Sequence, residues 1–230
     1  MAFFTVKADA ESVRDYSGEG SSSYINKSGM YEVILKNVIA EVTKNGSQVL
    51  HLWIEYMGKE QPIYNAIRLT NNDGTPNFGQ DLFNKLCVVV GASDGTVIDD
   101  PIPMQLPMGK GGELKTVDIL PNFVDEPIHL HVRMEYSMYN DKIQESKVVK
   151  NFFRVPDKAS ASEIVNNAEE KGKQYEKENE SIQPSYKDGL TEEDVEAWLA
   201  ERRSGKKEEP KNNNKPAGGF GAKRTFGRKV

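Results

Sequence analysis

The chain has 230 residues, of which 37% are hydrophobic, and its mean hydropathy is −0.63. This polarity predicts one ordinary domain accompanied by segments that bury little and stay disordered. No apolar run approaches the ~20 residues that a membrane-spanning helix requires, and the first residues lack the long apolar stretch of a signal peptide. The single cysteine, Cys87, excludes an intramolecular disulfide, so we expect a cytoplasmic protein.

The net charge of −5 is unevenly distributed along the chain. Residues 191–201 carry five negative charges and no positive one, whereas residues 202–230 carry ten Lys or Arg against two Glu. Residues 1–190 therefore sum to −8. An acidic body is unfavourable for binding nucleic acid, because contacts between cations and phosphates supply most of the non-specific affinity. Any such binding must rest on local basic patches and on the basic end of the chain.

The first part of the chain predicts three antiparallel strands in a meander, preceded by a polar, Gly/Ser-rich lead-in over residues 1–28. The Asn45-Gly46 pair predicts a type I′ turn between the first two strands, because both residues tolerate positive φ. Apolar residues of the second strand fall on one parity, so His51 and Trp53 point away from the predicted core. The strands are expected from Met30 to the Asn45-Gly46 turn, over 47–57 and over 61–69.

A helix and two long strands follow. Apolar residues at three- and four-residue steps predict a helix over about 79–90. Residues 92–127 are rich in Gly and Pro, and we interpret them as a long connection with one short strand at 114–120. Alternating apolar residues predict strands over 128–139 and about 147–155.

The resulting order, β-β-β-α-β-β, is that of the OB-fold, a five-stranded Greek-key barrel. We therefore expect an all-β protein with minor α, in which residues 29–156 form an OB-fold domain that binds nucleic acid. An SH3-like barrel or another small barrel is the alternative. Residues 157–180 predict a polar helix or linker, and residues 181–230 predict a flexible tail with a short amphipathic helix over 191–203 and a basic tip.

No catalytic motif is found in the sequence. Residues 109–112 (GKGG) lack the spacing of a phosphate-binding loop, and three His with one Cys cannot close a zinc site without carboxylates. His129 and His131 share one face of a strand, but a solvent-facing polar pair is the simpler interpretation. We expect no enzymatic activity, no cofactor and no metal site.

Aromatic and basic residues share the outward parity of the predicted strands, as in a groove where rings stack on bases and cations contact phosphates. The residues expected to contact nucleic acid are His51, Trp53, Tyr64, Arg68, Lys110, His129, His131, Arg133, Lys150, Phe152 and Arg154 in the domain, and Lys223, Arg224, Phe226, Arg228 and Lys229 in the tail. The alternative is that Trp53 and Phe152 lie under the 92–127 connection as a secondary core. The residues expected to contact a protein partner are Val195, Trp198, Leu199 and Phe220.

Three stretches carry a resemblance to a known family. They are INKSGMYEVILK at residues 25–36, the Asn45-Gly46 hairpin leading into LHLWI at 50–54, and VVKNFF at 148–153 followed by DKASASEI at 157–164. In these stretches the chain resembles bacteriophage single-stranded DNA-binding proteins with an OB-fold. The resemblance implies a protein of the host cytoplasm that coats single strands during DNA replication or recombination and recruits replication or recombination proteins through its tail. The basic end departs from the acidic tip of many such proteins.

A second class of function fits the acidic body better. In this interpretation the chain is a non-enzymatic adapter or host-takeover protein, which uses the barrel as a scaffold and the tail helix as a ligand. Binding of oligonucleotides at low salt separates the two hypotheses, because only the first requires it.

Overall fold

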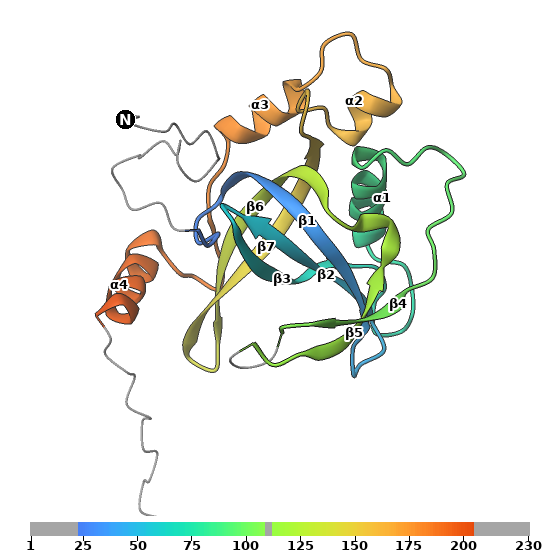
Figure 1. Cartoon of the computed structure of the whole chain (residues 1–230). Coiled ribbons are helices and arrows are strands. Elements are labelled where there is room, and N and C mark those ends of the chain that lie inside the picture. The colour runs from blue at the N-terminus through green and yellow to red at the C-terminus, as the bar shows by residue number, and fades with distance from the viewer. Residues whose placement is uncertain (1–22, 109–111, 205–230) are drawn as a thin grey trace, which may run out of the picture. The chain divides into compact units, whose positions relative to one another are not determined.

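The structure, a computed structural model, describes residues 23–108 and 112–204 (Figure 1). The chain divides into two compact units, residues 1–191 and 192–230, and the first holds the whole β-sheet. Within the described residues, no helix has both the length and the apolar character needed to cross a membrane.

The first unit is built on one largely antiparallel sheet that curls into a barrel-like arrangement (Figure 1). The strands are β1 (Gly29–Val42), β2 (Gln48–Tyr56), β3 (Lys59–Arg68), β4 (Ile102–Leu106), β5 (Lys115–Leu120), β6 (Glu126–Tyr139), β7 (Lys142–Arg154) and β8 (Ser185–Tyr186). The long strand β1 pairs with β2 along one edge, and with β6 and then β5 along the other. The predicted mostly-β architecture with few helices is confirmed.

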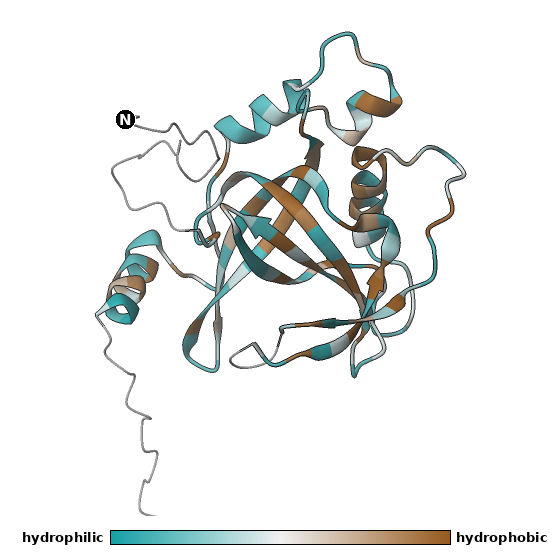
Figure 2. Ribbon diagram, viewed as in Figure 1, coloured by the Kyte–Doolittle hydropathy of each residue, from teal (hydrophilic) through white to brown (hydrophobic). Residues whose placement is uncertain are grey.

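Alternation along the strands determines which side chains the barrel buries. Leu52 of β2 pairs with Val38 of β1 on one side and with Ile63 of β3 on the other, and all three are buried. Directly paired residues of an antiparallel sheet point to the same face. Figure 2 shows apolar residues along the strands and α1, whereas α3 is mostly hydrophilic. Burial of each such aliphatic side chain stabilises the fold by roughly 1.5–3 kcal/mol.

Helix α1 (Gly79–Val89) starts against the end of β3 and confirms the predicted helix to within one residue. A Cβ atom on Gly79 would lie 2.0 Å from the carbonyl oxygen of Arg68, so only glycine permits this close approach. Leu86 and Val89 bury the inner side of the helix. Phe83 packs on Phe123 with ring centroids 5.6 Å apart, and Phe123 lies in the 3-10 turn η2 (Pro121–Phe123).

Two turns show different outcomes. Residues 43–47 form a longer loop in which Gly46 has φ of 86° but Asn45 does not have a positive φ, so the predicted type I′ turn is wrong. The N–H of Gly46 donates to the carbonyl of Thr43 at 2.9 Å and closes this loop. Between β6 and β7, Asn140 and Asp141 have φ of 49° and 58°, which a two-residue type I′ turn requires.

The segment interpreted as a long connection holds more structure than expected. It forms the hairpin of β4 and β5, and β5 pairs with β1 through Ile39 and Ile119. The predicted short strand at 114–120 corresponds to β5, but β4 was missed. Proline is found mostly on edge strands because it cannot donate a backbone hydrogen bond. Pro103 lies within β4, which among the described residues pairs with β5 alone.

Three helices follow the barrel. Residues 157–180 contain two short ones, α2 (Ala161–Val165) and α3 (Lys173–Glu180), where one polar helix or a linker was expected. A capping box between Ser160 and Glu163 fixes the start of α2, as each side chain bonds the backbone N–H of the other residue. Helix α4 (Glu192–Arg203) lies in the second unit and coincides with the helix predicted over 191–203.

Candidate nucleic-acid interface

Trp53 lies on the outward parity of β2, as predicted, but its ring is covered. Leu106 and Ile119 of the β4–β5 hairpin pack with Ile39 and Trp53 in one apolar cluster, which leaves Trp53 only 5% exposed. The indole N–H donates to a carboxylate oxygen of Glu60 at 2.7 Å. The ring is therefore part of a secondary core, and the prediction that it is free to stack on bases is wrong.

His51, the outward neighbour of Trp53, is also buried and is held by two hydrogen bonds. Its Nδ1 accepts from the backbone N–H of Asn65 at 2.8 Å, and its Nε2 lies 2.8 Å from a carboxylate oxygen of Glu41. Because Nδ1 accepts, the ring proton lies on Nε2 and is donated to Glu41. The imidazole therefore orders the bulged part of β3 and is not positioned to meet a strand.

The two histidines of β6 point outward, as predicted, and α3 covers both of them. His131 Nδ1 lies 2.6 Å from Oε2 of Glu178. Oε1 of Glu178 accepts from the side-chain amides of Asn151 at 2.8 Å and Gln174 at 2.7 Å. Burial raises the pKa of Glu178, but the hydrogen bonds from His131, Gln174 and Asn151 outweigh burial and hold the pKa below its usual value. An ionised Glu178 thus fastens α3 to β6 and β7.

Tyr175 of α3 covers the other half of this face. Its ring centroid lies 5.2 Å from that of His129 and 5.3 Å from that of Phe153. Burial is the main cause of the lowered pKa of His129, which favours a neutral imidazole. His129 and His131 are consequently placed to support α3, and the prediction of an open groove over β6 is wrong.

A β-bulge at Lys150 reverses the predicted parity at the end of β7. The register between β6 and β7 shifts by one residue at this point, so Lys150 has no partner on β6. Phe152 consequently pairs with Leu130 and is fully buried, while Phe153 takes the outward position beneath α3. The prediction that Phe152 shares an accessible face with Lys150 and Arg154 is wrong.

Two of the predicted basic contacts are occupied by carboxylates. Arg133 bonds Glu135, and Arg154 donates two hydrogen bonds to Asp157 at 3.0 and 2.6 Å. The Arg154 guanidinium is the main cause of the lowered pKa of Asp157, about 2. A guanidinium that is already paired with a carboxylate has fewer N–H donors left to bind a phosphate. Lys150 is exposed at the bulge.

The accessible part of the predicted interface lies on β3. Tyr64 is 52% exposed and meets His51 edge-on at 5.7 Å, and Arg68 is exposed at the end of the strand. At the start of β3, the ammonium of Lys59 lies 4.0 Å from the ring centroid of Tyr24, which is 49% exposed. We call the residues at the two ends of β3 together the β3 surface: Tyr24 and Lys59 at its start, and Tyr64 and Arg68 toward its end.

Sequence reasoning missed Tyr24 and Lys59. Tyr24 belongs to the polar lead-in, but the N–H of the next residue, Ile25, donates to the side chain of Gln61 in β3 at 3.0 Å. The buried Ile25 beside a tyrosine was the one signal that this part of the lead-in packs on the barrel. Beside Lys59, Tyr56 meets Tyr31 edge-on at 5.3 Å.

The predicted contacts in the tail are only partly described. Lys110, Phe220 and the tip residues Lys223, Arg224, Phe226, Arg228 and Lys229 lie outside the described residues. In α4, Val195 is buried, and Trp198 and Leu199 are half-buried. The guanidinium of Arg202 lies 4.6 Å from the ring centroid of Trp198. The spacing of Val195, Trp198 and Leu199 places them on one side of the helix.

The chemistry of reactive groups in the barrel unit is limited. Burial raises the pKa of the half-buried Cys87 thiol to about 11, so it is protonated at neutral pH. No group of three or more His, Cys, Asp or Glu in residues 23–108 and 112–204 could hold a metal ion. No protein-family model matches the chain, and no curated protein matches it.

Proposed function

We propose that this chain is a non-enzymatic OB-fold protein that binds single-stranded DNA through the β3 surface. The connectivity is the observation that carries the proposal: β1, β2 and β3 form a meander, α1 follows, β6 returns to pair with β1, and β7 pairs with β6. This order supports an OB-fold in which the β4–β5 hairpin is an insertion. OB-folds bind oligonucleotides over the face of their second and third strands, where Tyr64 and Arg68 lie.

Stacking must supply more of the affinity than charge. Each tyrosine that stacks on a base is worth about 1–3 kcal/mol. Lys59 and Arg68 can contact phosphates, but Glu55 and Glu60 lie opposite each other on β2 and β3 close by. Two phosphate contacts predict a shallow salt dependence for the barrel, with a log–log slope of about −1.4.

The biological role follows from the resemblance in the sequence. A protein that coats single strands in the cytoplasm of a phage-infected cell needs sequence-tolerant binding, which stacking on tyrosines provides. The tail would recruit replication or recombination proteins through Val195, Trp198 and Leu199 of α4, and its basic tip would add affinity for phosphates.

Titration of a fluorescein-labelled oligo-dT with the full chain tests the proposal. At low salt we expect saturable binding, and Tyr64→Ala should weaken it about 5- to 100-fold through the loss of one stacking ring. Tyr139→Ala is the matched control, because Tyr139 is 62% exposed at the β6–β7 turn and lies outside the β3 surface. Equal affinities of the wild-type chain and Tyr64→Ala would rule out the β3 surface.

The acidic body and the amphipathic α4 favour a second candidate function, a non-enzymatic adapter. In this case Val195, Trp198 and Leu199 bind a protein, and the barrel serves as a scaffold. A wild-type chain that fails to bind any oligonucleotide at low salt, while it remains folded, would support the adapter and exclude strand coating.

A further inference from the structure

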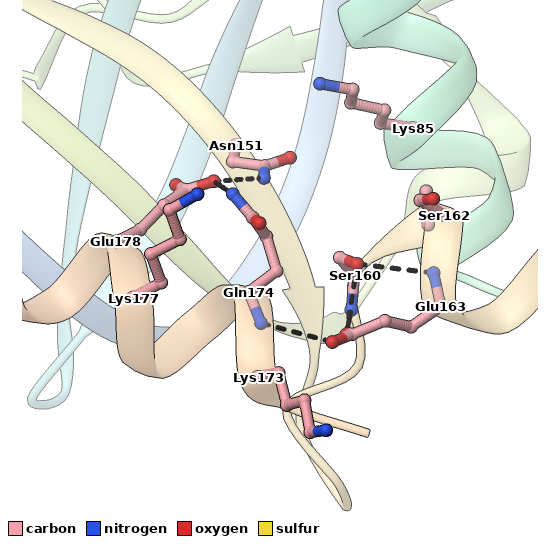
Figure 3. A pocket seen from close by; sticks show the side chains of 10 residues that line it. Lys85, Asn151, Ser160, Ser162, Glu163, Lys173, Gln174, Lys177 and Glu178 are labelled. Carbon is pink, nitrogen blue, oxygen red and sulfur yellow. Dashed lines mark hydrogen bonds between the residues drawn. The ribbon is translucent and has the colours of Figure 1, made fainter. Parts of the chain in front are cut away.

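A polar pocket of about 330 Å³ lies between α1, β7, α2 and α3, and it shares no residue with the β3 surface. Figure 3 shows its walls: Lys85 projects from α1, Asn151 from β7, Ser162 from α2 and Lys177 from α3. The volume is at the lower end of the range for small-molecule sites. It therefore has room for a small polar group.

Two carboxylates in the pocket wall are fully engaged by the protein itself. Glu163 accepts from the N–H of Ser160 at 2.8 Å, from its hydroxyl at 3.0 Å and from the N–H of Gln174 at 3.1 Å. Glu178 is held by its three side-chain partners on β6, β7 and α3. Burial raises the pKa of Glu163, but the hydrogen bonds from the backbone and from Ser160 have the larger effect and hold the pKa below its usual value. Glu163 is therefore ionised at neutral pH. The hydrogen bonds of these two carboxylates therefore hold α2 and α3 in place.

The three lysines of the pocket differ in whether their ammonium group forms an ion pair. Lys173 forms an ion pair with Glu170, and its ammonium points away from the pocket (Figure 3). Lys85 and Lys177 project from opposite walls, and neither ammonium forms an ion pair with a residue in the described ranges. Because residues 1–190 carry a net charge of −8, two unpaired cations facing one pocket are an unusual local arrangement.

A hydroxyl donor lies on the same pocket wall. The oxygen of Ser162 accepts from the side-chain amide of Asn166 at 3.3 Å, which leaves its own proton free to be donated. Two ammonium groups and one hydroxyl match a tetrahedral anion, since lysine binds phosphate as a compact point charge.

We propose that this pocket binds a phosphate group, with Lys85 and Lys177 supplying the charge and Ser162 a hydroxyl donor. The phosphate can belong to a strand held by the β3 surface or be free in solution. The strand source rests on the proposed function, whereas the phosphate site itself does not. None of these residues stood out in the sequence, because α1, α2 and α3 bring them together only in the folded chain.

The test follows backbone amide NMR signals of Ser162 and Gln174 in the full chain during titration with inorganic phosphate, against sodium chloride at equal ionic strength. We expect saturable shifts that the chloride titration does not produce. The double variant Lys85→Ala/Lys177→Ala should weaken phosphate binding at least tenfold, and Lys173→Ala is the matched control on the same helix. All three substituted lysines are exposed, so their removal should leave the fold intact. The absence of a saturable shift, or an equal response in the double variant, overturns the proposal.

Titration of the same variants with oligo-dT identifies the source of the phosphate. A strand phosphate predicts that the double variant loses affinity and that its log–log salt slope becomes shallower by about 1. Loss of inorganic phosphate binding with unchanged oligo-dT affinity assigns the pocket to a free phosphate. A wild-type chain that binds phosphate but no oligonucleotide contradicts the proposed function and supports the phosphate site.

Discussion

The indole of Trp53 is held in two ways at once. Its ring packs against Ile39, Leu106 and Ile119, and its N–H donates to Glu60. Both interactions stabilise the seam between the barrel and the β4–β5 hairpin. Neither leaves a face of the ring available for a base.

Trp53→Phe should therefore reduce stability and leave strand binding intact. The substitution keeps an aromatic ring but removes the hydrogen bond and part of the buried area, so we expect a loss of about 1–3 kcal/mol in the free energy of unfolding. Urea denaturation measures this loss, and oligo-dT affinity should stay within twofold of wild type. A tenfold loss of affinity in a folded variant would return Trp53 to the interface.

Asp157 makes a pH-dependent contribution to stability. Its pKa of about 2 lies below the unfolded value of 3.8, so its ion pair with Arg154 stabilises fully above about pH 4 and is lost as the pH falls toward 2. With its side chain partly exposed, we expect Asp157→Asn to cost about 1 kcal/mol at pH 6 after allowing for solvent screening. The difference from wild type should shrink between pH 4 and pH 2. A difference that stays constant over this range would contradict the assignment.

At the scale of an element, the bulge at Lys150 decides which phenylalanine enters the barrel. With the bulge, Phe152 pairs with Leu130 inside, and Phe153 meets Tyr175 of α3 outside. Because side chains alternate along a strand, a regular strand in which Lys150 was paired would exchange the two positions.

Deletion of Lys150 should therefore be mild, whereas insertion of one alanine after Asn151 should be damaging. The deletion removes only the residue that has no partner on β6, so Asn151 and Phe152 keep their partners His131 and Leu130, and we expect a loss of no more than about 1 kcal/mol in the free energy of unfolding. The insertion places Phe152 on the outward parity and should lower the free energy of unfolding by more than about 3 kcal/mol. Circular dichroism and urea denaturation compare the two variants. A deletion variant as unstable as the insertion variant would mean that the bulge does not set the parity.

Local periodicity predicted the elements whose pattern is regular and missed those fixed by distant contacts. The alternation of apolar residues in β6 and their helical spacing in α1 could be read directly from the sequence. Strand β4 was missed because Pro103 lies within it and proline argues against a strand. The bulge at Lys150 has no sequence signal, so the predicted inward and outward positions of Phe152 and Phe153 were exchanged. The cover over the β6 face depends on the bond between His131 and Glu178, which are 47 residues apart. Of the predicted barrel contacts, Tyr64, Arg68 and Lys150 are exposed.

At the scale of the whole molecule, the proposed binding combines base stacking on the barrel with phosphate contacts by the tail. Residues 205–230 hold eight Lys or Arg and two Glu, whereas the body is acidic. Phosphate contacts by the tail should steepen the salt dependence of binding, while stacking on β3 should not.

A chain that ends at Ser204 separates these contributions. We expect it to bind oligo-dT more weakly, with a log–log salt slope shallower by several units than that of the full chain. Its residual binding should still depend on Tyr64. An unchanged affinity and slope would remove the basic tip from the mechanism.

The most direct test of the account is to map, by NMR, which residues of the full chain respond to a single-stranded oligonucleotide. We expect the largest shifts at Tyr24, Lys59, Tyr64 and Arg68, with little change at Trp53. Shifts centred on Trp53, or no shifts on β3 at saturating oligonucleotide, would contradict the claim that the β3 surface binds the strand.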